Sequence, residues 1–354
     1  MTAEAIAGDV HAPTASRPAT VSRFLAWADG LPMHGWWFYP LLAVALLAQS
    51  HAVLWASGAV PVGTIQPLFA SAVFYGPFVL AALAYINRSS ERALAAFWPA
   101  TGWPDSSRAA WAEAFRTSPR GYGWLALAFG LAVAIGAYVS APGTAVGNVV
   151  ASPAVLLAAY LPSSVLGYSL VVVAIVHTFR QLRLVARIHR EATRIDPFDR
   201  VPLYAFSYLT FRTGLLYVIS GYYSVTVQGQ LQAENPFVIA VLAAAFGVGI
   251  ACFVLPLWGI HERLIREKEA LLLEVEGRIG RLADEMYRRI DAGQFDGTKV
   301  VGESLGGVAA LRDRIVRLPT WPWPPNLLRG FLSTLLIPVV VYIASRVIGG
   351  QVGV

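Results

Sequence analysis

The chain has 354 residues, of which 56% are hydrophobic and 14% charged, and its formal net charge is +6. Soluble domains carry roughly 25% charged residues, so this composition excludes a water-soluble fold as well as a disordered or collagenous chain. The single cysteine, Cys252, excludes an intrachain disulfide and a cysteine-based zinc cluster. The remaining class is an all-α, multi-pass membrane protein.

Several stretches are long and apolar enough to cross a bilayer, which takes about 20 residues of helix. The seven candidates are 36–59, 65–86, 121–140, 153–178, 213–233, 236–260 and 328–349. The first 35 residues predict a tail with a short interfacial helix around Phe24–Trp27, and they lack the basic and apolar regions of a cleaved signal peptide. The fifth stretch is polar for a membrane helix, so charge supports it better than hydropathy does.

The positive charges predict which loops face the cytoplasm. Every lysine and arginine except Arg346 lies in the first 35 residues or in segments 87–120, 179–212 and 261–330. Basic loops stay in the cytoplasm, so an even number of spans separates each pair of these segments. The chain is therefore predicted to be a seven-transmembrane helical bundle with the N-terminus inside, the C-terminus outside and long cytoplasmic helical extensions.

These spans divide the chain into four parts. We assign residues 1–35 to a cytoplasmic tail with an interfacial helix, 36–260 to transmembrane helices one to six, 261–325 to a cytoplasmic helical hairpin, and 326–354 to transmembrane helix seven. Within the hairpin, the sequence predicts a long helix to about Asp291, a turn at 294–298, a second helix over 304–318 and a proline–tryptophan elbow.

Apolar residues recur along the first hairpin helix with the heptad-like spacing of a helix that packs against other helices. They are Leu272, Val275, Ile279, Leu282, Met286 and Ile290. One interpretation is a hairpin that folds on itself. The other is an oligomerisation bundle shared between subunits, and it is slightly favoured because a lone two-helix hairpin rarely buries enough apolar area.

The sequence carries no motif for catalysis or metal binding, so we expect neither an enzyme nor a cofactor. His189 and Glu191 have the spacing of a ligand pair, but arginines surround them and a solvated helix face is the favoured interpretation. His51 lies inside the first span, where it is either an interfacial hydrogen-bonding residue, as we favour, or a functional group. The basic loops also hold acidic residues, so anionic lipid rather than nucleic acid is their expected partner.

The last span has a polar stripe. Thr334 and Ser345 are about three helical turns apart and share a face, near Val341 and Ile348. Hydroxyls beside branched apolar side chains line narrow pores, but they also hydrogen-bond between packed helices. From the stripe alone, packing is the stronger interpretation.

The layout resembles the seven-transmembrane insect olfactory and gustatory receptor channels. The shared features are an inside N-terminus, seven spans, helices four to six extended into the cytosol, and a cytoplasmic helix (304–318) before a short last span. The resemblance implies four subunits joined by the cytosolic helices, a cation pore lined by the last helix, and a ligand pocket in the outer half of the bundle. The Trp321-Pro322-Trp323 elbow is also similar to that of a group of bacterial membrane proteins, which implies the bacterial inner membrane.

The leading hypothesis is a homo-oligomeric, tetrameric, cation-permeable channel-like receptor gated by a small apolar molecule. By the analogy, the pore-lining residues are Thr334, Val341, Ser345 and Ile348. The expected ligand-pocket residues, for which ordinary helix packing is the favoured alternative, are Phe74, Tyr75, Tyr138 and Tyr160. The other hypotheses are a non-conducting membrane sensor or scaffold that acts through its cytoplasmic helices, and a carrier of a neutral lipophilic molecule.

Overall fold

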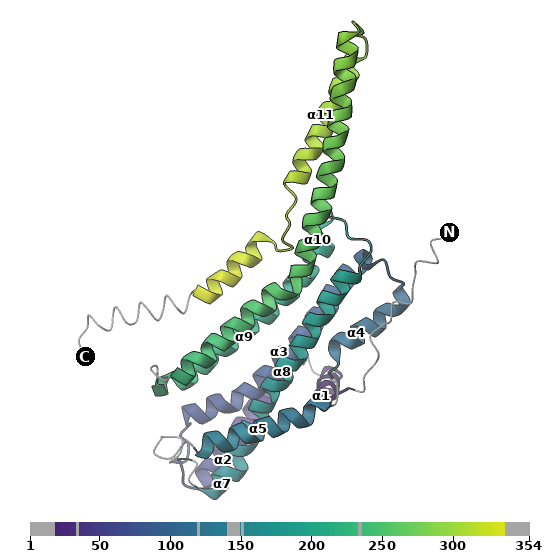
Figure 1. The fold of residues 1–354 in the computed structure, drawn as a ribbon. Helices are drawn as coiled ribbons and strands as arrows, with labels where there is room; N and C mark the ends of the chain where they lie inside the picture. The colour runs from purple at the N-terminus through teal and green to yellow at the C-terminus, as the bar shows by residue number, and fades with distance from the viewer. Residues whose placement is uncertain are drawn as a thin grey trace, which may run out of the picture.

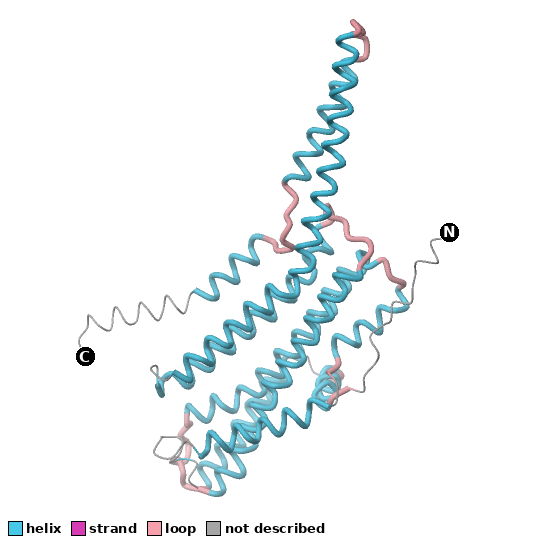
Figure 2. The backbone as a smooth tube through the Cα atoms, viewed as in Figure 1, coloured by secondary structure: helices cyan, strands magenta, loops and turns pink. Residues whose placement is uncertain are grey.

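A computed structural model describes residues 18–32, 35–118, 121–139, 149, 152–232 and 236–336, and within them the regular elements are helical, with no strand. The first helices are α1 (Thr20–Asp29), α2 (Gly35–Ala56), α3 (Pro67–Thr101), η2 (Asp105–Ser107), α4 (Arg108–Arg116) and α5 (Gly121–Val139). They are followed by α7 (Pro153–Val155), the π-turn η3 (Leu156–Tyr160), α8 (Leu161–Glu191), α9 (Arg200–Gln232), α10 (Pro236–Asp291) and α11 (Thr298–Val316). Residues 325–336 are also helical. Figures 1 and 2 show a bundle from which α10 and α11 project together.

The prediction of an all-α membrane protein is confirmed at the level of helix length and composition. Four helical segments in the described part of the chain are long and apolar enough to span a membrane: Trp36–Ala56, Phe69–Thr101, Pro153–Glu191 and Phe246–Asp291. A shorter apolar helix covers Gly121–Gly136. The number of seven spans and their orientation stay predictions.

The helices of the bundle approach closely where glycine replaces a side chain. On α9 and α10, a Cβ added to Gly214 would stand 2.6 Å from the carbonyl oxygen of Gly249. On α5 and α8, a Cβ on Gly130 would stand 2.7 Å from the carbonyl oxygen of Val165. Membrane helices associate through such small-residue contacts because lipid provides little hydrophobic drive between them.

A large aromatic cluster fills the end of the bundle where α3 and α8 terminate. Phe97, Trp111, Phe115 and Phe206 are fully buried there, brought together from α3, α4 and α9. His189 lies in the same cluster and is 2% exposed, with its ring edge-on to Phe97 at 5.0 Å and to Phe206 at 5.3 Å. The interpretation of this histidine as part of a solvated helix face is therefore wrong, because the last turns of α8 are covered by neighbouring helices.

The hairpin formed by the distal part of α10 and by α11 has its first helix end and its turn where they were predicted, but its second helix begins at Thr298, six residues before the predicted start at 304. α10 ends at Asp291, and α11 returns after a turn in which Gly293 and Gly297 have φ values of +69° and +90°. In the heptad-like stripe, Val275 is buried, Leu272, Ile279, Leu282 and Met286 are half-buried, and Ile290 is 39% exposed. Because α11 packs on α10 within the same chain, the self-folded interpretation explains this burial, and the oligomerisation role stays a prediction.

The proline–tryptophan elbow docks onto α10 through stacked rings. Trp321 lies on His261 with ring centroids 3.7 Å apart, and Trp323 lies on Trp321 at 4.4 Å. Trp323 also stacks on Phe253 of α10 at 4.7 Å. Phe253 in turn packs against Phe331 at 4.4 Å. The elbow therefore connects α10 rigidly to helix 325–336.

Candidate functional site: an apolar cavity between α3, α8 and α9

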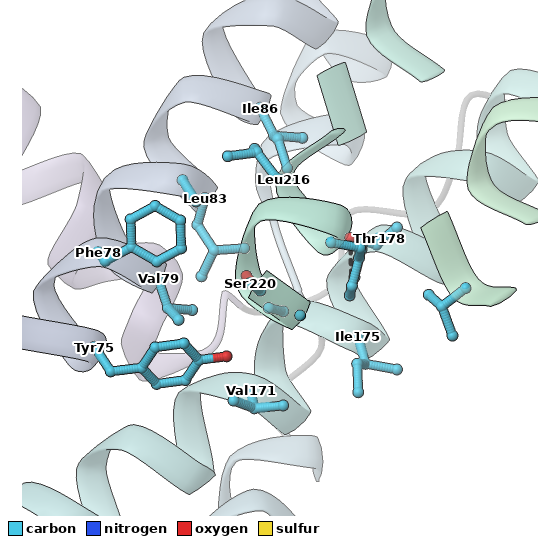
Figure 3. A pocket seen from close by; sticks show the side chains of 15 residues that line it. Tyr75, Phe78, Val79, Leu83, Ile86, Val171, Ile175, Thr178, Leu216 and Ser220 are labelled. Atoms are coloured by element: carbon cyan, nitrogen blue, oxygen red, sulfur yellow. Dashed lines mark hydrogen bonds between the residues drawn. The ribbon is translucent and has the colours of Figure 1, made fainter. Parts of the chain in front are cut away.

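A cavity of about 250 Å³ lies between α3, α8 and α9, with one residue contributed by α10 (Figure 3). An engineered cavity of about 150 Å³ suffices to bind benzene, so this space is large enough for a small organic molecule. The lining residues are Tyr75, Phe78, Val79, Ala82, Leu83 and Ile86 of α3, Val171, Ala174, Ile175 and Thr178 of α8, Leu216, Tyr217, Ser220 and Gly221 of α9, and Val248 of α10.

The lining follows from helical periodicity. On each of the three main helices, the lining residues recur at intervals of one and three positions, which places them on a single helix face. Helix α3 supplies a tyrosine, a phenylalanine and four aliphatic residues to this face, and α8 supplies three aliphatic residues and a threonine. Small side chains at Ala82, Ala174 and Gly221 leave the space that larger residues would fill.

Four lining residues carry a side-chain hydroxyl. The Tyr217 hydroxyl donates to Thr178 Oγ1 at 3.1 Å, which joins α9 to α8. Tyr75 of α3 and Ser220 of α9 carry the other two hydroxyls. No charged residue is among the described residues that line the cavity. A neutral, mostly apolar molecule with at most one or two hydrogen-bonding groups matches this chemistry, because a buried charge without a partner is costly.

Aromatic rings wall the cavity on the α3 side. The rings of Tyr75 and Tyr223 are stacked at 5.3 Å, and Phe78 lies 6.4 Å from Tyr223 with nearly parallel planes. The Tyr223 hydroxyl donates to the carbonyl oxygen of Ser71. These contacts hold α9 against α3 and fix the direction of the Tyr75 side chain, which Figure 3 shows at one edge of the cavity.

A buried polar network lies next to the cavity: Asn87 follows the lining residue Ile86 in the chain, and His177 precedes the lining residue Thr178. His177 Nε2 is 2.7 Å from Asn87 Oδ1, and His177 Nδ1 is 2.8 Å from Ser118 Oγ. A neutral imidazole satisfies both contacts when Nε2 donates to Asn87 and Nδ1 accepts from the Ser118 hydroxyl. Gln181 Nε2 donates to Asn87 Oδ1 at 3.1 Å and to the Phe115 carbonyl at 2.9 Å. This network ties α3 and α8 to the segment that follows α4.

His177→Ala is expected to lower the free energy of unfolding by about 2–3 kcal/mol, because Ser118 Oγ loses its partner in a buried site and Asn87 Oδ1 keeps only the contact from Gln181. Chemical unfolding of the detergent-solubilised protein measures this loss. In a double-mutant cycle with Asn87→Ala, we expect a coupling energy of about 1–2 kcal/mol. Simple additivity of the two changes would contradict the network.

The structure brings one of the predicted pocket residues, Tyr75, to the cavity. Phe74 is 37% exposed on the adjacent face of α3. Tyr138 and Tyr160 pack 6.4 Å apart in a separate cluster, where Tyr160 donates to the Ala134 carbonyl at 3.3 Å. Packing therefore accounts for these last two tyrosines, whereas Tyr75 lines the cavity.

Of the predicted pore residues, Thr334 is the one that the structure describes. Its Oγ1 donates to the carbonyl oxygen of Gly330, one turn earlier, at 2.9 Å. Its own carbonyl accepts from the Tyr222 hydroxyl at 3.2 Å. Val341, Ser345 and Ile348 lie outside the described residues.

The sequence prediction missed Thr178, Tyr217 and Ser220. For Tyr217 and Ser220 the available signal was the polarity of the fifth predicted span, because hydroxyl-bearing residues inside an apolar helix face the interior of a bundle. Thr178 ends the fourth predicted span and had no comparable signal. Among the described residues, no group of three or more His, Cys, Asp or Glu side chains is arranged to hold a metal ion.

Comparisons with known proteins add no relative: no protein-family model, no curated protein and no solved structure matches the chain.

Proposed function

We propose that the chain crosses the membrane seven times, with the N-terminus in the cytoplasm and the C-terminus outside. Six spans are carried by α2, α3, α5, α8, α9 and α10, and the seventh by residues 328–349. The distribution of basic residues and the continuous helix over Arg200–Gln232 support this arrangement. It puts the α2–α3 loop outside and the hairpin in the cytoplasm.

Cysteine labelling in intact cells tests this topology. In a Cys252→Ser background, a membrane-impermeant maleimide is expected to label Val62→Cys in the α2–α3 loop and to leave Phe295→Cys at the hairpin tip unlabelled. Both positions are exposed in the folded chain, so access to the reagent decides the result. Labelling at both positions, or at Phe295→Cys alone, would contradict the proposed orientation.

We propose that the protein is a membrane receptor for a small, neutral, mostly apolar molecule, which binds in the cavity between α3, α8 and α9. The observation that carries this proposal is the cavity itself: about 250 Å³ of apolar space with four hydroxyl-bearing residues on its wall. Concave, mostly apolar sites with a few placed polar groups are the common form of small-molecule sites. The proposed receptor is not expected to have enzymatic activity.

We further propose that the receptor is a homotetramer whose last helix lines a cation pore. Two contacts support a mechanical connection from the cavity to that helix. Tyr217 and Ser220 line the cavity on α9, and two residues after Ser220 is Tyr222, whose hydroxyl donates to the Thr334 carbonyl. Val248 lines the cavity on α10, and Phe253 of the same helix packs on Phe331. A ligand that shifts α9 or α10 acts directly on helix 325–336.

Cation flux from liposomes tests the channel proposal. The purified protein is reconstituted into vesicles loaded with a cation-sensitive dye, and a panel of small apolar molecules is added. We expect ligand-dependent, saturable flux from the native chain. Ser345→Ala, on the face of the last helix that is expected to line the pore, should alter the ion selectivity of that flux. Ligand binding without flux would contradict the pore.

A non-conducting sensor is the second candidate, and the continuity of α10 favours it specifically. This helix runs unbroken from Val248 at the cavity to Asp291 at the hairpin tip. Ligand-induced motion of the bundle would then reach a cytoplasmic partner through the hairpin. A spin label at Tyr287, which is exposed, would change its mobility on ligand addition while vesicles stay impermeable to cations.

A further inference from the structure

We infer that Arg88 and Arg212, supported by the rings of Trp36 and Tyr85, form a binding site for the phosphate of an anionic phospholipid in the cytoplasmic leaflet. This inference rests on the proposed topology, which places these residues at the inner membrane surface. It concerns a site distinct from the apolar cavity, and it involves other residues of α3 and α9.

The four side chains meet at one place on the bundle. The rings of Trp36 and Tyr85 lie 6.0 Å apart. The guanidinium carbon of Arg88 lies 5.5 Å from the Trp36 ring centroid, and that of Arg212 lies 5.4 Å from the Tyr85 ring centroid. Two neighbouring rings therefore each hold one arginine, an arrangement in which stacking orients the guanidinium and leaves its N–H groups available.

Helix lengths place the cluster at one membrane depth. Three stretches of helix separate the cluster from the other side of the bundle: from Trp36 to Ala56 at the end of α2, from Arg88 back to Pro67 at the start of α3, and from Arg212 to Gln232 at the end of α9. Each of these distances is about 20 helical residues, or roughly 30 Å, which equals the thickness of the hydrocarbon core. Trp36 is 49% exposed, as expected for an aromatic residue at the headgroup level.

The charge balance of the cluster leaves one cation without a counter-charge. Arg88 Nη2 pairs with Asp29 Oδ1 at 2.5 Å. Arg212 is half-buried, donates to Ser89 Oγ at 3.2 Å, and pairs with no carboxylate among the described residues. A partly buried guanidinium at the membrane surface is stabilised by an anion. The phosphodiester of a lipid headgroup is available at this depth and fits the planar fork of arginine.

Native mass spectrometry of the delipidated full-length protein tests the site, with phosphatidylglycerol as the anionic lipid and phosphatidylcholine as the neutral comparison. We expect tighter binding of the first phosphatidylglycerol than of phosphatidylcholine. Arg212→Gln is expected to weaken that binding at least about tenfold, whereas Arg183→Gln, at an exposed arginine of α8, changes it by about twofold or less. An equal loss in both variants would show general surface attraction and overturn the site.

Two further arms keep the outcome decisive. Arg212→Lys retains the positive charge but loses the planar fork, so we expect it to bind the lipid several-fold more weakly than the native chain. This variant takes the place of Arg212→Gln in the test if Arg212→Gln does not fold. Inorganic phosphate at millimolar concentration is expected not to displace the lipid; displacement would reassign the site to a soluble phosphate compound. Lipid binding is read without any apolar ligand, so its failure is distinguishable from failure of the receptor proposal.

Discussion

Replacing Ala174 by phenylalanine is expected to abolish saturable binding of small apolar ligands. Ala174 lines the cavity on α8. A phenyl ring at this position occupies space that the ligand needs, and the surrounding helices are packed too closely to yield it. We expect at least about a hundredfold loss of affinity, equal to about 2.7 kcal/mol, measured by equilibrium dialysis of detergent-solubilised protein.

Ala128→Phe provides the matched control. Ala128 is exposed on α5, so the same substitution adds apolar surface without entering the cavity. We expect it to leave ligand affinity unchanged. If both variants bind ligand as the native chain does, the cavity is packing space and the proposed binding site is wrong.

Gly214→Ala is expected to lower the free energy of unfolding of the bundle by about 2–3 kcal/mol. The new Cβ would stand 2.6 Å from the Gly249 carbonyl oxygen, a backbone atom that cannot rotate away. Helices α9 and α10 must separate to accept it, and this separation also loosens the contact of Val218 with the Gly249 region. Thermal or chemical unfolding in detergent measures the effect.

Gly247→Ala is the corresponding control on α10. An added Cβ at Gly247 meets no atom within 4 Å, and alanine favours helix over glycine by up to about 1 kcal/mol. We expect this variant to be as stable as the native chain or slightly more so. A similar loss at both glycines would show that glycine matters here for a reason other than close helix approach.

The membrane helices were predictable from their long apolar runs and the first hairpin helix from its heptad-like stripe, whereas α4 and the start of α9 over 200–212 lack such a signal and were not predicted. The ends of the hairpin were also accurate: the prediction placed the first helix end near Asp291 and the turn around Gly297, and the structure agrees. Proline and glycine determine these positions locally, so no tertiary contact was needed to find them.

The cavity was less accessible to sequence reasoning. It depends on which faces of α3, α8 and α9 meet, and on small residues such as Ala82 and Gly221 that leave space between larger ones. Helical periodicity identifies a face but does not say which neighbour covers it. Tyr75 was selected with three other aromatic residues, and only the packing distinguishes it from Tyr160, which contacts α5.

The surroundings of His189 and Arg212 were also not predictable, because they depend on which helices pack against each other. His189 follows a run of arginines, a pattern typical of a solvated helix face, yet its ring lies between Phe97 and Phe206. Likewise, the contacts of Arg212 with Tyr85 and Ser89 join residues that are more than 120 positions apart. Pairings of this range arise from the arrangement of the helices, which local patterns do not encode.

Site-resolved photolabelling with a small aryl diazirine tests the receptor proposal most directly, because it separates a specific site from dissolution in lipid. The labelled protein is digested and the modified residues are located by mass spectrometry. We predict saturable labelling, suppressed by excess non-reactive analogue, on Tyr75, Phe78 or Tyr217, and its loss in Ala174→Phe. Labelling restricted to lipid-exposed residues such as Leu125 and Leu131, rising in proportion to probe concentration, would contradict a ligand site in this cavity.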